Sequence, residues 1–152
     1  MSVINIDQAI KHLRAEPEDI EDVQGKLDAA EDKAKSYLQR NFYADKEALE
    51  NAQKEIINLL NSAMKKRDQA LLEANNIANE VDSSLLRSIA EKNYDDSRME
   101  IEAIGRGIVI NDSIRMACLL ALGYFYENRQ DNDELPEASI NLLTPFRIKW
   151  GV

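Results

Sequence analysis

The 152-residue chain is 44% hydrophobic and 31% charged, which is too apolar for a disordered chain and too interrupted by charge for a membrane protein. Its formal net charge of -9 argues against ordinary DNA binding, which relies on Lys and Arg contacts to phosphates. Cys118 is the only cysteine, so no intrachain disulfide can form, and the longest apolar run is far shorter than the roughly 20 residues that span a bilayer. We expect one soluble domain.

Two helices are predicted near the N-terminus. The first is short, with Asn5 as its N-cap and Gln8 in the capping-box position, and it ends near Arg14. The second begins at Pro17 and runs to about Arg40. Its apolar residues recur at spacings of three and four and predict one buried stripe: Ile20, Val23, Leu27, Ala30, Ala34, Tyr37 and Leu38.

Residues 26–104 contain no Gly or Pro and are rich in good helix formers. From about Asp45 to Val81 the apolar residues predict one long, coiled-coil-like helix whose Ala-rich seam is broken by Arg67. The seam that we expect to be buried consists of Leu49, Ile56, Leu60, Ala63, Ala70, Ala74, Ile77 and Val81.

A return helix is predicted to follow, giving an antiparallel hairpin. Its expected N-caps are Asp82, Ser83 and Ser84, and the polar run 93–97 leaves an interruption of this helix open. Gly105-Arg106-Gly107 is expected to end the hairpin.

The C-terminal part is predicted to hold the core helix. Residues 108–110 indicate an extended connector, and Asn111 or Asp112 can cap a helix over about 113–129 that is apolar nearly all round. Pro136 then opens a last short helix that Pro145 stops after Thr144, leaving a short extended tail. The expected fold class is therefore all-α, a helical bundle with a long central helical hairpin.

The residue list offers little catalytic chemistry. His12 is the only histidine, has no plausible nucleophile beside it, and is expected to be partly buried or capping. Cys118 lies in the most apolar segment, where a thiol is usually inert. The 28 Asp and Glu residues are expected on solvated faces. We predict no enzymatic activity, no cofactor and no metal site.

Two blocks of sequence resemble the head–tail connector (adaptor) proteins of long-tailed bacteriophages. The first runs from Ile6 to Arg14 and continues through acidic residues to Tyr37-Leu38-Gln39-Arg40. The second, more specific block runs from Val109-Ile110-Asn111-Asp112 to Leu142-Leu143-Thr144-Pro145-Phe146-Arg147. Within it the resemblance is carried by Ala117, Leu119, Leu120, Gly123, Tyr126-Glu127-Asn128-Arg129 and Leu135-Pro136.

This resemblance implies a domain in which residues 1–44 and 105–152 form a connector-like core and residues 45–104 a helical hairpin elaboration. It also implies a structural virion protein at the head–tail junction, present in the host cytoplasm during assembly. Its subunits would form a homo-oligomeric ring under the portal protein, extend the DNA channel and dock a tail-side stopper or completion protein. DNA would pass the acidic lumen without sequence-specific binding, and no membrane is involved.

Eight residues are candidates for subunit or portal contacts. Tyr126, Glu127, Asn128 and Arg129 suit either a subunit seam or simple helix termination, and the two readings stay open. Phe146, Arg147, Lys149 and Trp150 form an aromatic and cationic tail expected to dock on the portal or a neighbouring subunit, or else to fold back on its own core. The alternative function is a cytoplasmic helical adaptor or regulator that binds partners through the hairpin.

Overall fold

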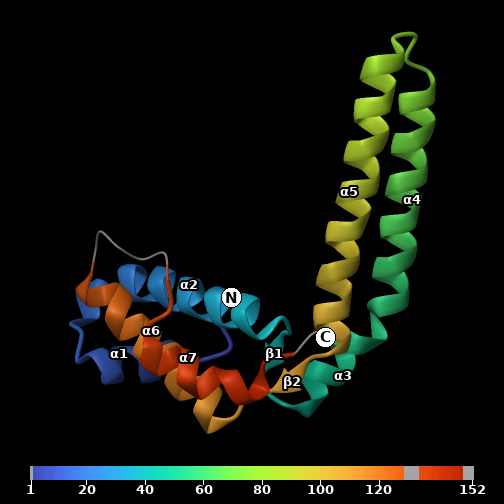
Figure 1. Ribbon diagram of the computed structural model, residues 1–152. Helices are drawn as coiled ribbons and strands as arrows, with labels where there is room; N and C mark the ends of the chain where they lie inside the picture. The colour runs from blue at the N-terminus through green and yellow to red at the C-terminus, as the bar shows by residue number, and fades with distance from the viewer. Residues whose placement is uncertain (1, 129–133, 149–152) are drawn as a thin grey trace. The chain divides into compact units, whose positions relative to one another are not determined.

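The computed structural model describes residues 2–128 and 134–148 and confirms an all-α protein with a long helical hairpin (Figure 1). The chain divides into two compact units. Residues 1–49 and 107–152 form one, here called the terminal unit, and residues 50–106 form the other, the hairpin unit.

The N-terminal helices form as their capping residues predict. Helix α1 (Ile6–Leu13) starts at Asn5, whose side chain accepts the Asp7 N–H at 2.7 Å, and it ends at Arg14 in the left-handed conformation. A 3-10 turn (Pro17–Asp19) leads into α2 (Ile20–Leu38), because proline fixes the backbone without needing a hydrogen-bond donor. Of the predicted stripe of α2, Val23, Leu27, Ala30, Ala34 and Leu38 are fully buried and Tyr37 is half-buried, but Ile20 is exposed because it stands at the first position of the helix.

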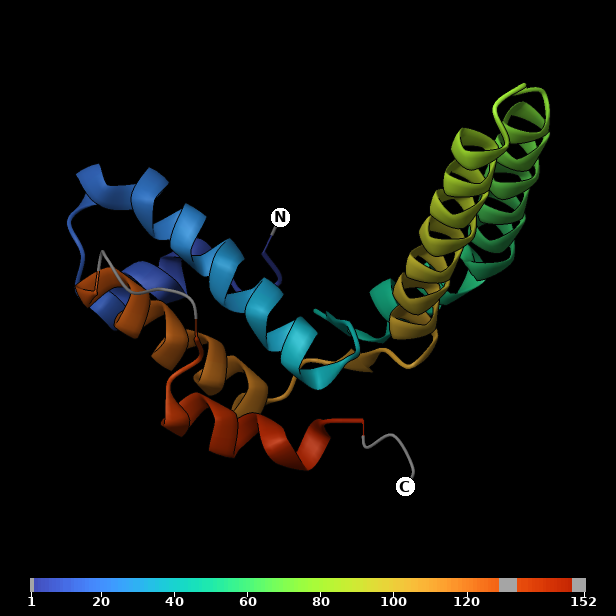
Figure 2. The same ribbon diagram turned by 45° about the horizontal axis from the view of Figure 1, so that its top comes forward.

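Helix α6 (Asp112–Glu127) is the central helix of the terminal unit. Asn111 caps it by accepting the Ile114 N–H at 2.9 Å. It packs against α2 on one side and against α7 (Glu137–Leu143) on another, as both views of the chain show (Figure 1, Figure 2). A buried serine joins the last pair, since the Ser139 hydroxyl donates to the carbonyl of Ala117 at 2.8 Å. The buried residues of these helices make one hydrophobic core.

The predicted extended connector is one strand of a small parallel sheet. Strand β2 (Ile108–Val109) pairs with β1 (Phe42–Tyr43), with Phe42 opposite Ile108. The Ile110 N–H continues the ladder by donating to the Tyr43 carbonyl at 2.8 Å. The pairing ties together the two places where the chain leaves and re-enters the terminal unit.

The prediction of one helix from Asp45 to Val81 is wrong. Helix α3 (Lys46–Lys54) is separated at Glu55 from α4 (Ile56–Asn75), which ends six residues before Val81. Asparagine side chains compete for backbone hydrogen bonds, so the run 75–79, with three asparagines, favours a turn over helix. Consequently Ile77 and Val81 are exposed rather than buried in the seam.

The return helix α5 (Glu80–Gly105) starts earlier than predicted and is not interrupted. Its N-cap is Asn79, which accepts the Val81 N–H at 3.0 Å. Ser83, a predicted cap, is instead buried and donates to the Ala74 carbonyl at 2.8 Å, linking the two helices. The polar run 93–97 stays helical, and within it the Ser97 hydroxyl donates back to the Asn93 carbonyl at 2.9 Å.

Candidate interaction surfaces

The end of α6 carries the first group of predicted contact residues. Tyr126 is half-buried, and its hydroxyl donates to Asp19 at 2.9 Å while the Lys26 ammonium lies 5.6 Å from the centre of its ring. Asn128 is the C-cap of α6, and its side-chain amide donates to the Tyr124 carbonyl at 2.9 Å. Tyr126 therefore joins the end of α6 to the residue before α2, and Asn128 terminates α6.

Glu127 and Arg129 complete this group. Glu127 is exposed, and no contact within the described residues fixes a role for it. Arg129 lies outside the described residues, as do Lys149 and Trp150 of the tail.

The described part of the C-terminal tail folds back on the C-terminal end of α2. The Arg147 guanidinium stacks 4.7 Å from the centre of the Tyr37 ring, and the Ile148 N–H donates to the Leu38 carbonyl at 3.1 Å. Phe146 is partly buried against the hydrophobic core, and its carbonyl accepts a hydrogen bond of 3.4 Å from Arg40. We call residues 144–148 with these contacts the C-terminal anchor.

The two groups of predicted contact residues do not meet in one site. Tyr126 contacts Asp19 just before α2, whereas the anchor contacts Leu38 at the other end of that helix. At about 1.5 Å of rise per residue the two ends of α2 lie roughly 28 Å apart.

An acidic stripe, defined by Glu18, Asp22 and Asp32, runs along the outward side of α2 and of the 3-10 turn that precedes it. These residues are exposed and share one helical face with exposed Gly25 and Ala29. The stripe belongs to a strongly acidic segment, since residues 1–32 contain nine of the 28 Asp and Glu but three of the 19 Lys and Arg. Asp22 pairs with Lys26 and Asp32 lies 3.6 Å from Lys35, so the negative charge is only partly balanced.

Glu31 departs from the expectation that the carboxylates are solvated. Its side chain is fully buried, accepts the N–H groups of Val3 and Ile4 at 2.8 Å each, and lies 3.5 Å from the Lys35 ammonium. The available signal was its position on the buried stripe, four residues after Leu27 and three before Ala34. Glu31 fixes the N-terminal segment to α2.

The hairpin unit exposes many apolar side chains for its size. Its seam is built from small side chains, with Ala63, Ala74 and Ala90 buried between α4 and α5. Large apolar residues stand around this seam at 39–76% exposure: Ile57, Leu59, Met64, Leu72, Ile77, Val81, Leu85, Leu86, Ile89 and Met99. An apolar surface of this extent on two helices indicates a contact surface.

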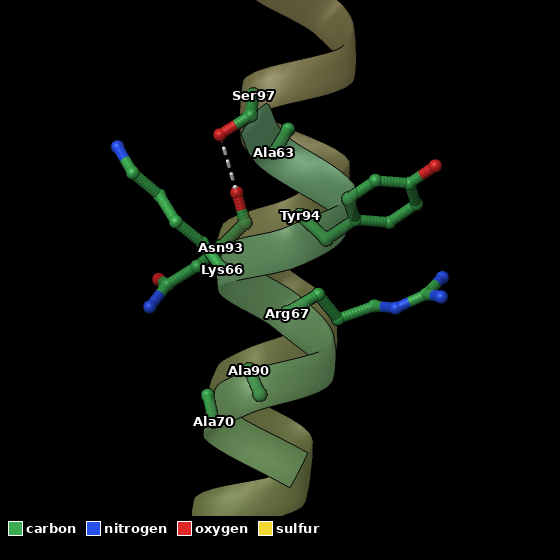
Figure 3. A pocket seen from close by; sticks show the side chains of 8 residues that line it. All are labelled: Ala63, Lys66, Arg67, Ala70, Ala90, Asn93, Tyr94 and Ser97. Atoms are coloured by element: carbon green, nitrogen blue, oxygen red, sulfur yellow. Dashed lines mark hydrogen bonds between the residues drawn. The ribbon is translucent and has the colours of Figure 1, made fainter. Parts of the chain in front are cut away.

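Two shallow hollows follow the seam and share Ala70, Ala90 and Asn93, so they are continuous. Figure 3 shows the first, with Lys66 and Asn93 on one side of the helix pair and Arg67 and Tyr94 on the other. The Arg67 guanidinium lies 4.6 Å from the centre of the Tyr94 ring and donates to Asp68 at 2.8 Å, a hydrogen bond that raises the pKa of Arg67.

Cys118 and His12 are the two side chains considered above as candidates for catalysis. Burial raises the pKa of the Cys118 thiol to about 12, so the nucleophilic thiolate is suppressed. His12 is exposed in the last turn of α1, so the expectation of partial burial is wrong, and a capping role stays a prediction. Across residues 2–128 and 134–148 no cluster of three or more His, Cys, Asp or Glu side chains could hold a metal ion. Every helix in the part of the chain described is too short or too polar to cross a bilayer.

Comparisons of this chain with family models, with curated proteins and with solved structures find no match.

Proposed function

We propose that the protein is a non-enzymatic structural subunit of a phage head–tail connector. It would assemble as a ring under the portal protein, extend the DNA channel and present a surface to a tail-side stopper or completion protein. It would reside in the virion after assembly in the host cytoplasm.

One observation carries this proposal. The two blocks of sequence that resemble the connector family are separated in the chain by the whole helical hairpin, yet both belong to the terminal unit. Their apolar residues share one core, in which Ala9 and Leu38 from the first block join Ala117 and Leu143 from the second. The resemblance therefore falls on one physical unit and not on scattered segments.

The acidic stripe supports the role of a DNA conduit. A lumen lined by Glu18, Asp22 and Asp32 would repel the phosphate backbone, so DNA could pass without sticking. We propose that this stripe faces the lumen, and a mapped lumen dominated by Lys and Arg would overturn the idea.

The contacts of the C-terminal anchor limit which tail residues we propose for the contact with the portal. Because Phe146 packs against the protein's own core and Arg147 stacks on Tyr37 of α2, we assign the portal contact to Lys149, Trp150 and the exposed part of Arg147. Aromatic and Arg side chains are the usual energetic anchors of protein interfaces.

The test is co-purification of the tagged full chain with the portal protein and with particles of its phage. We expect the full chain to be retained, and deletion of residues 149–152 to weaken portal association at least about tenfold. Deletion of 145–152 should weaken it further because the anchor is lost. Tyr124→Ala, an exposed aromatic on α6, is the matched control and should bind normally.

Each outcome bears on a different part of the proposal. Unchanged association of both deletion variants shows that the tail does not dock on the portal. Absence of the full chain from particles and from the portal complex overturns the connector role.

The exposed apolar residues of the hairpin favour a second candidate, a cytoplasmic helical adaptor or regulator. This alternative predicts a stable complex with a non-virion protein, and the complex should form in cells that contain no phage particles. Loss of this complex on hairpin deletion, with no association with the portal, would support it.

A further inference from the structure

The hairpin has two faces of different composition. One face, here called the hollow face, contains the residues that line the hollow not drawn in Figure 3. Among them are Glu73 and Ile77 of α4 and Leu86 and Ile89 of α5. Lys66 belongs to it because it precedes Glu73 by seven residues, two turns of helix.

The second, here called the charged face, is the side on which Figure 3 places Tyr94. On α5, Arg87, Glu91 and Arg98 follow the same stripe as Tyr94 at spacings of three and four. On α4, Asp68 and Leu71 lie on this side, since Asp68 binds Arg67 and Leu71 follows it by three residues.

The register between α4 and α5 gives each residue a height along the hairpin. Arg67 stacks on Tyr94, and a Cβ at Gly105 would lie 3.5 Å from Ile56, so these pairs are level. The two helices are antiparallel, so each step toward the tip adds one residue on α4 and removes one on α5. Counted in this way from the level pairs, Glu73 of α4 lies within one residue of the height of Arg87 of α5.

The two faces are complementary in charge at equal height. Glu73 on the hollow face corresponds in height to Arg87 on the charged face. Lys66 on the hollow face lies within two residues, about 3 Å, of the height of Asp68 and within about 6 Å of that of Glu91. Arg67 also lies on the charged side, one residue from the height of Lys66, and its charge is paired with Asp68 of the same helix.

The positions above and below are complementary as well. Ile89 on the hollow face is within one residue of the height of Leu71 on the charged face, so apolar meets apolar. Nearer the base, Asp96 and Glu100, three and seven residues beyond Asn93 on the hollow side, flank the height of Arg98. Two unlike faces that match without any vertical shift suit copies that stand side by side and point the same way.

We propose that the hollow face of one copy's hairpin packs against the charged face of a second copy's hairpin, in parallel and at equal height. Each copy then uses both faces, one for each neighbour. Such a contact is heterologous, so it propagates around a closed ring rather than ending at a dimer. The inference rests on the proposed ring and assigns to the hairpin the task of joining its subunits.

Cysteine cross-linking of the full chain tests the contact directly. Leu71→Cys and Ile89→Cys in one chain lie on opposite faces of the same hairpin, so a disulfide between them must join two copies. Oxidation of this variant, alone and bound to the portal, should give a ladder of oligomers on a non-reducing gel. The wild type, with buried Cys118 alone, is the control and should give none.

Charge variants in this background test the register. Glu73→Arg and Arg87→Glu should each lower the ladder yield about fivefold or more, because like charges meet. An equal mixture of the two variants should restore it, since every contact between one variant and the other again joins opposite charges. Lys92→Glu, on an exposed position between the two faces of α5, is the matched control and should cross-link normally.

Glu73→Cys with Arg87→Cys is a second reporter pair at exposed positions, should Leu71→Cys impair folding. Dimers from a single-cysteine variant would show two-fold pairing and overturn the inference. Portal binding without any ladder would overturn it too and leave the proposed function standing. A ladder from a chain that never binds the portal or enters particles would support the hairpin contact and overturn the connector role.

Discussion

At the residue scale, Glu31 shows how a single buried carboxylate can fix a chain segment. Two backbone N–H groups, from Val3 and Ile4, have Glu31 as their acceptor, and Lys35 balances its charge. A buried carboxylate is tolerated only when its oxygens are hydrogen-bonded or paired, and here both conditions hold.

We predict that Glu31→Ala lowers the free energy of unfolding by about 3 kcal/mol, because two buried N–H groups lose a charged acceptor. Glu31→Gln should cost less but still destabilise, since its NH2 group opposes one of the N–H donors. Urea unfolding followed by circular dichroism measures both. Asp32→Asn, at the exposed neighbouring position, is the control and should change stability by about 0.5 kcal/mol or less. Equal effects of Glu31→Ala and Asp32→Asn would contradict this role.

At the element scale, helix ends were less predictable than helix faces. The three- and four-residue spacing of apolar side chains correctly predicted α2, and the nearly all-round apolar composition correctly predicted α6, because each pattern is a property of many residues together. At the tip of the hairpin, two sets of residues could serve as the N-cap of α5: Asn79 and the run 82–84. Their intrinsic preferences for the N-cap position are similar, so these preferences do not decide where the helix begins. The Ser83 hydroxyl donates to the Ala74 carbonyl in the seam, so Ser83 does not cap the helix. This contact favours Asn79 as the N-cap.

We predict that Asn79→Ala weakens the first turn of α5 by about 1 kcal/mol, the usual value of an N-cap side chain. Amide hydrogen exchange of residues 81–84 should then accelerate about fivefold. Ser84→Ala, at a predicted cap that is exposed, is the matched control and should leave exchange unchanged. Faster exchange in Ser84→Ala than in Asn79→Ala would mean that the helix begins at the later cap.

At the scale of the whole molecule, the charge is unevenly distributed between segments. The acidic stripe lies in residues 1–32, where Asp and Glu outnumber Lys and Arg by nine to three. A surface with an excess of negative charge repels nucleic acid. If the stripe lines a channel, its sign should govern the passage of DNA.

We predict that Glu18→Lys, Asp22→Lys and Asp32→Lys together slow DNA ejection from assembled particles about tenfold, because DNA would bind the reversed stripe. Ejection followed by dye fluorescence at two salt concentrations measures the effect, and higher salt should reduce it. Reversal of three exposed carboxylates elsewhere in the terminal unit, Glu47, Glu134 and Glu137, is the control. Equal slowing of DNA ejection by the stripe substitutions and by the control substitutions would show that the acidic stripe does not line the lumen.

The amino-acid sequence was enough to predict the helical class, the cap at Asn5, a cap at Asn111 or Asp112, and most of the buried residues of α2 and α6. These features depend on local hydrogen bonds and on apolar periodicity, which a single sequence displays. The family resemblance likewise came from residues in the two terminal blocks.

Which side chains meet across the chain became apparent from the packing of the helices and could not be read from the sequence. The Tyr126–Asp19 hydrogen bond, the contact of Arg147 with Tyr37 and the β1–β2 pairing each join residues more than 60 positions apart. The burial of Glu31 and the two unlike faces of the hairpin also depend on how helices pack. Such contacts form because the compact chain must satisfy buried polar groups wherever a partner lies, and sequence spacing does not specify that partner.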